Sequence, residues 1–230
     1  MGLIPNKDIT GEIEYNSSLT NEKWEKILGL STLKILEKGI AYIPEDRSTQ
    51  GIINEFQVNE NSWLGYLTQP IRARVYIGET SPEKIQEGKL ILKRKYKYYL
   101  PYSLMNKFSN KIKTDLDVAT PSVKTLIKNL SGGNQQKVIL GREFAKNPRL
   151  IIASQPTRGV DIGVTEKVRN ALIDMRNVAA GIFLISSDLD EVLSLSDYIL
   201  VMYEGKIVGR GPINEFTIER LSKLMTTGRE

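Results

Sequence analysis

The sequence predicts an α/β fold whose core is interrupted by a helical insertion, and three observations support this prediction. The chain has 230 residues, of which 40% are hydrophobic, and this is enough to bury a sizeable core. From about Leu126 onward, short apolar runs alternate with helical patterns, as in a sheet that is covered by helices. The middle of the chain, about 52–128, has basic segments with helical patterns instead.

The first half of the chain is less regular than the second. Gly11–Tyr15 and Gly39–Ile43 are strand candidates, whereas Pro82–Tyr98 and Leu104–Asp115 have helical and basic patterns. We expect three parts: an N-terminal part of the α/β core (1–51), a helical subdomain (52–128) and the remainder of the core (129–230).

The second half predicts helices and strands in alternation. Asn134–Lys146 is a helix candidate, and the Asn-Pro pair after it would end the helix. Leu150–Ala153 and Ile182–Ile185 are continuous apolar runs, typical of strands that are buried on both faces. The residues between these two runs carry one apolar stripe at helical spacing: Val164, Val168, Ala171, Leu172 and Met175.

The last elements are predicted by capping and turn residues. Asp188 fits the N-cap of a helix, since an acidic residue follows three positions later. Tyr198–Tyr203 and Lys206–Gly209 flank a Glu-Gly pair, and this pattern predicts a hairpin. Apolar residues at helical spacing predict a closing helix over about 218–225.

The composition excludes several kinds of chemistry. The chain has no cysteine and no histidine. Disulfides, cysteine–histidine zinc sites, cysteine nucleophiles and imidazole proton relays are therefore excluded. No apolar run approaches the roughly 18 residues that cross a bilayer, and the first residues lack the apolar core of a signal peptide. We expect a soluble, cytoplasmic chain.

The positive charge is unevenly distributed. The net charge is +5, but the segment Ile71–Lys113 alone has 11 Lys and Arg residues against 3 acidic ones. Such a block is either a solvated face or a contact surface for an anionic partner, and the sequence leaves both interpretations open.

Ser131, Gly132 and Gly133 stand where a loop enters the helix candidate that follows. Adjacent glycines let the backbone approach a ligand closely, and Ser131 can cap the helix or donate to an oxygen. The first N–H groups of a helix favour anions, so this tripeptide fits a phosphate site. The alternative is a turn that only caps a helix.

The longer segment Leu130–Lys137 resembles the signature motif of ABC (ATP-binding cassette) ATPases. Further segments resemble other motifs of this family in the right order: Tyr42–Arg47 at the Q-loop, Leu150–Thr157 at the Walker B strand, Arg158–Asp161 at the D-loop, Ile185–Ser187 at the switch loop and Met202–Val208 at the strand pair after it. The residues of these motifs resemble those in the second cassette of tandem-cassette importers for simple sugars and nucleosides. The implied fold is a P-loop NTPase-like ABC cassette core, truncated at its N-terminus, with an inserted helical subdomain.

The resemblance implies that this cassette works in a pair. ABC cassettes pair head to tail, so each signature loop completes the ATP site of the other cassette, here expected to be the first cassette of the same polypeptide. The residues implied to face the partner's ATP are Ser131, Gly132, Gly133 and Gln135, and Asp161 in the D-loop would help to transmit closure. The assembled transporter would use ATP and Mg²⁺ and include membrane permease subunits. The cassette would lie at the inner face of the cell membrane, with no nucleic acid as partner.

Several catalytic positions depart from the family pattern. A phosphate-binding loop needs Gly-x-x-x-x-Gly-Lys-Ser/Thr, and no such string occurs in the chain. The chain is therefore expected to begin after the Walker A region. Ser154 stands at the position of the Walker B aspartate, Gln155 at the catalytic glutamate, Glu45 at the Q-loop glutamine and Ser187 at the switch histidine. A neutral amide orients water but does not accept its proton at neutral pH.

We therefore expect no catalytic residue, no metal ligand and no tightly bound cofactor in this chain, and no ATP turnover by the chain alone. Two alternatives stay open. The first is a competent ATPase whose P-loop is missing only from this piece, with Gln155 sufficient for slow turnover. The second is a nucleic-acid-binding module that uses Lys93–Tyr99, where cations alternate with aromatic residues; the same segment also fits a solvated helix.

Overall fold

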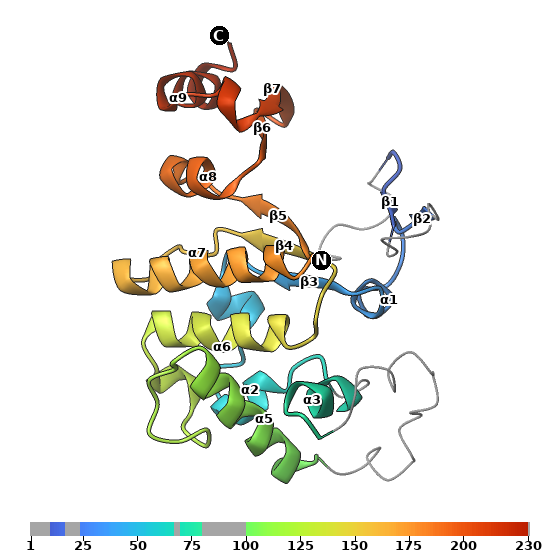
Figure 1. Ribbon diagram of the computed structural model, residues 1–230, viewed down its shortest axis with the longest axis vertical. Helices are drawn as coiled ribbons and strands as arrows, with labels where there is room; N and C mark the ends of the chain where they lie inside the picture. The colour runs from blue at the N-terminus through green and yellow to red at the C-terminus, as the bar shows by residue number, and fades with distance from the viewer. Residues whose placement is uncertain (1–9, 17–23, 67–69, 80–99, 230) are drawn as a thin grey trace.

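The computed structural model describes residues 10–16, 24–66, 70–79 and 100–229, which form a mixed α/β fold (Figure 1). The predicted helix Pro82–Tyr98 and the basic segment Lys93–Tyr99 lie outside the described residues. Within these ranges, no helix combines the length and the apolar character that a membrane span requires.

The central sheet is parallel and has the strand order β3-β4-β5. Its strands are β3 (Ile40–Ile43), β4 (Leu150–Ser154) and β5 (Gly181–Ile185), with Ile43 paired to Ala153 and Ala153 to Leu184. All three were predicted as strands, and this prediction is confirmed. Because parallel neighbours need long connections, helices lie in both crossovers, from β3 to β4 and from β4 to β5.

Two helices cover one face of this sheet. They are α6 (Gly132–Phe144) and α7 (Ile162–Asn177). Leu140 of α6 and Val168 and Leu172 of α7 pack with the buried strand residues Ile151 and Ala153. Helix α6 begins two residues before its predicted start, because Ser131 and not a later residue is its N-cap.

The opposite face of β5 corrects a prediction. The continuous apolar run was expected to be buried on both faces, but Phe183 is 50% exposed and Ile185 is 45% exposed. The apolar run Ile182–Ile185 thus predicted the strand correctly, but the prediction that it is buried on both faces was wrong. In the described part of the chain, α6 and α7 cover only the face of the sheet that contains Ile151 and Ala153.

A second group of helices packs on the other side of α6. These helices are α2 (Val58–Ser62), α3 (Pro70–Tyr76) and α5 (Tyr102–Asp115), which lie together below α6 in Figure 1. Their core is aromatic: the Phe108 ring centroid lies 4.7 Å from that of Tyr66 and 5.8 Å from that of Trp63. The helix predicted over Leu104–Asp115 is α5, which starts two residues earlier.

The C-terminal part begins with a capped helix. Asp188 caps α8 (Leu189–Leu195) as predicted, because its Oδ1 accepts from the Glu191 N–H at 3.0 Å. The strands β6 (Tyr198–Tyr203) and β7 (Lys206–Pro212) then form the predicted antiparallel hairpin.

The turn of this hairpin has two residues, Glu204 and Gly205, with φ of 45° and 76°, as a two-residue hairpin turn requires. The closing helix α9 (Ile218–Thr227) packs on β6. Short elements complete the fold: α1 (Thr32–Glu37), the antiparallel pair β1 (Glu14–Tyr15) and β2 (Glu25–Lys26), the π-helical turn η2 (Arg47–Gly51), and the 3₁₀ turns η4 (Ile127–Asn129) and η5 (Ile213–Glu215). Strand β1 occupies only the last two residues of the predicted Gly11–Tyr15.

Candidate functional site

The candidate site lies at the carboxyl edge of the parallel sheet. Glu45 follows β3, Gln155 follows β4 and Ser187 follows β5, each within two residues of the strand end. The carboxyl ends of parallel strands meet at one edge of a sheet, which is where ligands bind in open α/β folds. The topology thus places these three predicted positions along the same edge.

Gln155 and Ser187 are in direct contact. The Gln155 Nε2 donates to the Ser187 Oγ at 3.2 Å, and the Gln155 Oε1 accepts from the Ser187 backbone N–H at 3.4 Å. Gln155 has a left-handed φ of 47°, and its own N–H donates to the Ile185 carbonyl at 2.7 Å. The two residues at the predicted catalytic-glutamate and switch-histidine positions therefore form one neutral pair. Neither side chain accepts a proton at neutral pH.

The other two departures from the family pattern provide no free carboxylate. Glu45 forms an ion pair with Arg158, and Ser154 ends β4 opposite Ile185. Within the described ranges, no three carboxylates gather in a way that could hold a metal ion. The oxygens at this edge do not fit Mg²⁺. The Gln155 amide and the Ser187 hydroxyl are hydrogen-bonded to each other, and the Glu45 carboxylate is paired with the Arg158 guanidinium.

The turn before α6 has the geometry of an anion site. Ser131 caps α6, and its Oγ accepts from the Asn134 backbone N–H at 3.4 Å and from the Asn134 Nδ2 at 2.9 Å. These two bonds use both lone pairs of the hydroxyl, so its O–H is left to donate. The first N–H groups of α6 have no acceptor within the helix, and its dipole favours negative charge there.

Packing within the chain favours glycine at both glycine positions of this turn, and more strictly at Gly133, because the atom nearest Gly132 is the movable end of the Arg47 side chain. A Cβ on Gly132 would collide with the Arg47 guanidinium, and a Cβ on Gly133 would lie 2.8 Å from the Val164 Cγ2. The sequence suggested that these glycines let a ligand approach. The structure adds an internal reason for the absence of a side chain at both positions.

The glutamines after the turn are used inside the chain. The Gln135 Nε2 donates to the Ile127 and Leu130 carbonyls, each at 3.2 Å, so this amide group is committed to the preceding loop. The buried Gln136 donates to the Pro156 carbonyl at 2.8 Å and ties α6 to the loop after β4. The role of Gln135 at a partner's ATP stays a prediction.

Asp161 is the N-cap of α7, since its Oδ1 accepts from the Val164 N–H at 2.9 Å. This capping explains an aspartate here without any partner. Its predicted role in transmitting closure stays a prediction.

Arg47 was not predicted as a site residue. Its Nη1 donates to the Arg158 carbonyl at 2.9 Å and its Nη2 to the Gly159 carbonyl at 3.2 Å, both in the loop before α7. Beside it, Asp46 accepts from the Thr49 hydroxyl at 2.7 Å, and this bond is the main reason why the pKa of Asp46 is lowered. The only signal in the sequence was the Pro-Glu-Asp-Arg string at the Q-loop position.

Comparison with known proteins identifies a family and several relatives. The family described as ABC transporter matches residues 3–158. The guanosine import ATP-binding protein NupO of Bacillus subtilis is 36% identical over 94% of the chain, which covers 38% of that protein. The ribose import ATP-binding protein RbsA 1 of Rubrobacter xylanophilus is 35% identical over 84% of the chain and 34% of its own length. The chain thus spans less than two fifths of either relative.

Solved structures agree with the fold. A nucleotide-free ATP-binding cassette from an ABC transporter superposes with a TM-score of 0.60 at 23% identity, over 86% of this chain and 70% of that one. A dimeric cassette with ADP and phosphate gives a TM-score of 0.58 at 16% identity, over 82% and 70%. The fold is therefore that of an ATP-binding cassette, a P-loop NTPase fold, and the predicted fold class is confirmed. The chain belongs to the ABC transporter family.

Proposed function

We propose that this chain is a nucleotide-binding cassette of an importer for sugars or nucleosides, degenerate at its own ATP site, that supplies its signature turn to a partner cassette. Relatives that import guanosine and ribose support the substrate class. The resemblance to second cassettes supports a partner on the same polypeptide. In this proposal 52–128 is the helical subdomain between the two parts of the core.

One contrast carries the proposal. At the sheet edge, the neutral Gln155–Ser187 pair replaces the groups that would activate water. At the start of α6, by contrast, Ser131 caps the helix and accepts two hydrogen bonds from Asn134, so its O–H remains a donor beside the first N–H groups of the helix. In this proposal Ser131 provides a group for binding phosphate, whereas the Gln155–Ser187 pair provides no general base at the described sheet edge.

The partners follow from this division of roles. ATP and Mg²⁺ would be held on the partner cassette, which brings its own phosphate loop and carboxylates, and Ser131 would reach the γ-phosphate from across the interface. The N–H groups of α6 and the nearby Arg47 guanidinium add favourable charge. The pair of cassettes would bind permease subunits at the inner face of the membrane.

The test compares two serine caps of the same geometry in the assembled importer. Ser131 caps α6 and Ser31 caps α1, and each Oγ accepts a backbone N–H at 3.4 Å. Each Ser→Ala change removes a helix cap worth about 1 kcal/mol. Only Ser131→Ala removes the proposed phosphate donor, so it should lower ATP turnover roughly 100-fold, while Ser31→Ala leaves turnover unchanged.

Two results would contradict the proposal. Equal turnover in the Ser131→Ala and Ser31→Ala importers would mean that Ser131 does not contact the reacting nucleotide. Phosphate release from MgATP by the folded, isolated chain would mean that the chain is an ATPase in its own right and that its own site is not degenerate.

A further inference from the structure

Arg47 lies between two loops that are far apart in the sequence. Its guanidinium donates to the carbonyls of Arg158 and Gly159 at 2.9 and 3.2 Å, in the D-loop segment before α7. The same guanidinium lies against Gly132, the first residue of α6. One side chain therefore joins the signature turn to the D-loop segment.

Gly132 makes room for this guanidinium, and Gly159 lies on its other side at ordinary contact distance. A Cβ on Gly132 would overlap the Arg47 Nη2 and would also lie 3.3 Å from the Gly159 carbonyl oxygen. A Cβ on Gly159 would lie 3.6 Å from both Nη atoms, and its φ of 67° already favours glycine. The signature turn, the guanidinium and the D-loop segment are thus in van der Waals contact.

The backbone that carries Arg47 is itself held in place. Asp46 caps η2 by accepting from the Ser48 N–H at 2.9 Å and from the Thr49 hydroxyl at 2.7 Å. Glu45 forms a second link to the D-loop segment through its ion pair with Arg158. Since that pair is largely exposed, its strength is limited, and Arg47 provides the more enclosed of the two links.

We propose that Arg47 is a positioning residue: it fixes the signature turn at Ser131 and Gly132 against the D-loop segment at Arg158 and Gly159. It thereby sets the rate of ATP turnover at the ATP site that this turn completes on the partner cassette. The proposal rests on the proposed function, because Arg47 acts on the partner's ATP through Ser131. Its planar fork suits the task, since one guanidinium donates to two carbonyls at a fixed separation. A lysine at this position offers a single ammonium and loses that geometry.

The first experiment tests the contact in the chain itself and does not depend on ATP. Gly132→Ala should lower the melting temperature by roughly 3 °C, because the added Cβ displaces the Arg47 guanidinium from its hydrogen bonds to the Arg158 and Gly159 carbonyls. In the Arg47→Ala background, where the guanidinium is gone, the same Gly132→Ala change should cost less than half as much. Equal costs in both backgrounds would show that the guanidinium does not occupy this space.

The second experiment measures turnover in the assembled importer, normalised to the folded fraction. Arg47→Met should lower kcat about tenfold and leave the KM for ATP little changed. In this variant the signature turn at Ser131 and Gly132 is still present, but it is no longer held in its position. Arg47→Lys should recover part of the loss. The matched control is Arg210→Met on β7, an exposed position away from the site, which should match the unmodified protein.

A third measurement reports the positioning directly and uses the absence of cysteine in the chain. Spin labels on Asn129→Cys and Ile162→Cys, which flank the two loops, should give a narrow distance distribution that broadens in the Arg47→Met variant. An unchanged distribution together with unchanged kcat would overturn the proposal. If Ser131→Ala lowers turnover and Arg47→Met does not, only the role of Arg47 fails. If neither variant lowers turnover, the proposed function fails.

Discussion

At the scale of single residues, two neighbouring residues of α6, Arg142 and Glu143, have opposite charges and are both buried. Glu143 is 4% exposed and accepts from the Arg142 Nε at 3.0 Å and the Lys146 Nζ at 2.6 Å. Burial by itself raises the pKa of Glu143, but Lys146 and Arg142 outweigh it, so the pKa is lowered. Arg142 also donates to the carbonyls of Gly51 and Asn61 at 3.0 and 3.1 Å, and so ties α6 to the helices packed on it.

Replacement of Glu143 should reveal this network through its pH dependence. Glu143→Gln leaves two buried cations short of a partner and should lower the free energy of unfolding by about 3 kcal/mol at pH 7, measured by urea denaturation. The lowered pKa of Glu143 means that the native state binds fewer protons than the unfolded state. The stabilisation of the fold by the charged Glu143 is therefore present above about pH 4.3. It is lost as the pH falls through the folded pKa.

The difference between the unmodified chain and Glu143→Gln should therefore shrink as the pH falls below about 4.3. Glu12→Gln is the matched control, because Glu12 pairs with Lys26 on the surface and both side chains are 65% exposed. It should leave stability nearly unchanged. A constant difference across this pH range would show that the Glu143 charge does not contribute.

At the scale of elements, α6 lies between two hydrophobic clusters, one formed with the sheet and one formed with the helices on its other side. Its residues Val138 and Ile139 belong to the core shared with α2 and α5, and its Leu140 belongs to the core shared with the sheet. Close approach to α5 depends on Gly141, where a Cβ would collide with the Ile112 Cγ2 and lie 3.1 Å from the Leu116 Cδ1.

Two helical glycines should therefore respond to alanine in opposite directions. Gly141→Ala overpacks the contact between α5 and α6 and should destabilise the chain by about 1–3 kcal/mol in thermal or urea unfolding. Gly163→Ala on α7 meets only the Asp161 Oδ1 at 3.6 Å and should stabilise the chain by up to about 1 kcal/mol through helix propensity. A smaller cost of Gly141→Ala in the Ile112→Ala background would locate the clash. Stabilisation by Gly141→Ala would refute this packing.

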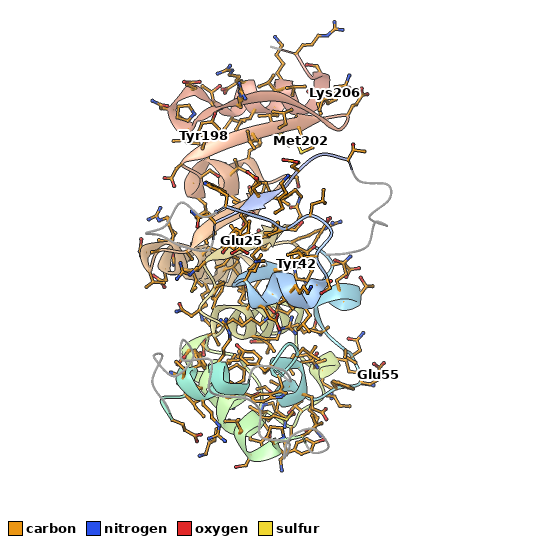
Figure 2. The ribbon with its side chains drawn as sticks, turned by 90° about the vertical axis from the view of Figure 1, so that its right-hand side faces the viewer. Glu25, Tyr42, Glu55, Tyr198, Met202 and Lys206 are labelled. Atoms are coloured by element: carbon orange, nitrogen blue, oxygen red, sulfur yellow. The ribbon has the colours of Figure 1, made fainter. Side chains whose placement is uncertain are left out.

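At the scale of the whole molecule, one face of the C-terminal hairpin is apolar and exposed. Tyr198, Leu200 and Met202 on β6 are 58%, 46% and 63% exposed, whereas Ile199 and Val201 on the other face pack on α9 (Figure 2 labels Tyr198 and Met202). We expect this exposed apolar face to promote self-association of the isolated chain.

A charge on this face should improve solubility without a cost in stability. Met202→Lys should lower the fraction of aggregate in size-exclusion chromatography and reduce binding of a hydrophobic dye, with an unchanged melting temperature. Val201→Lys, one residue earlier but 3% exposed, should instead prevent stable folding of the hairpin, because it buries an unpaired charge. A Met202→Lys chain that melts well below the unmodified one would mean that this face is covered.

The sequence alone determined the order and kind of most described elements, because these depend on local patterns. The apolar runs predicted β4 and β5, the Glu-Gly pair predicted the hairpin turn, and Asp188 predicted the start of α8. The family and the α/β fold class also followed from the motifs, and both are confirmed. The domain boundaries and the roles of the predicted site residues stay predictions.

Only the tertiary structure decided which groups face one another. It joined Gln155 to Ser187, revealed Arg47 between the signature turn and the D-loop segment, and showed that β5 is covered on one face. Local periodicity carries no information on contacts between residues that are far apart in the sequence. Gln155 and Ser187 are 32 positions apart, and Arg47 and Arg158 are 111 positions apart. Burial likewise depends on which elements pack together, so an apolar run predicts a strand but not how it is covered.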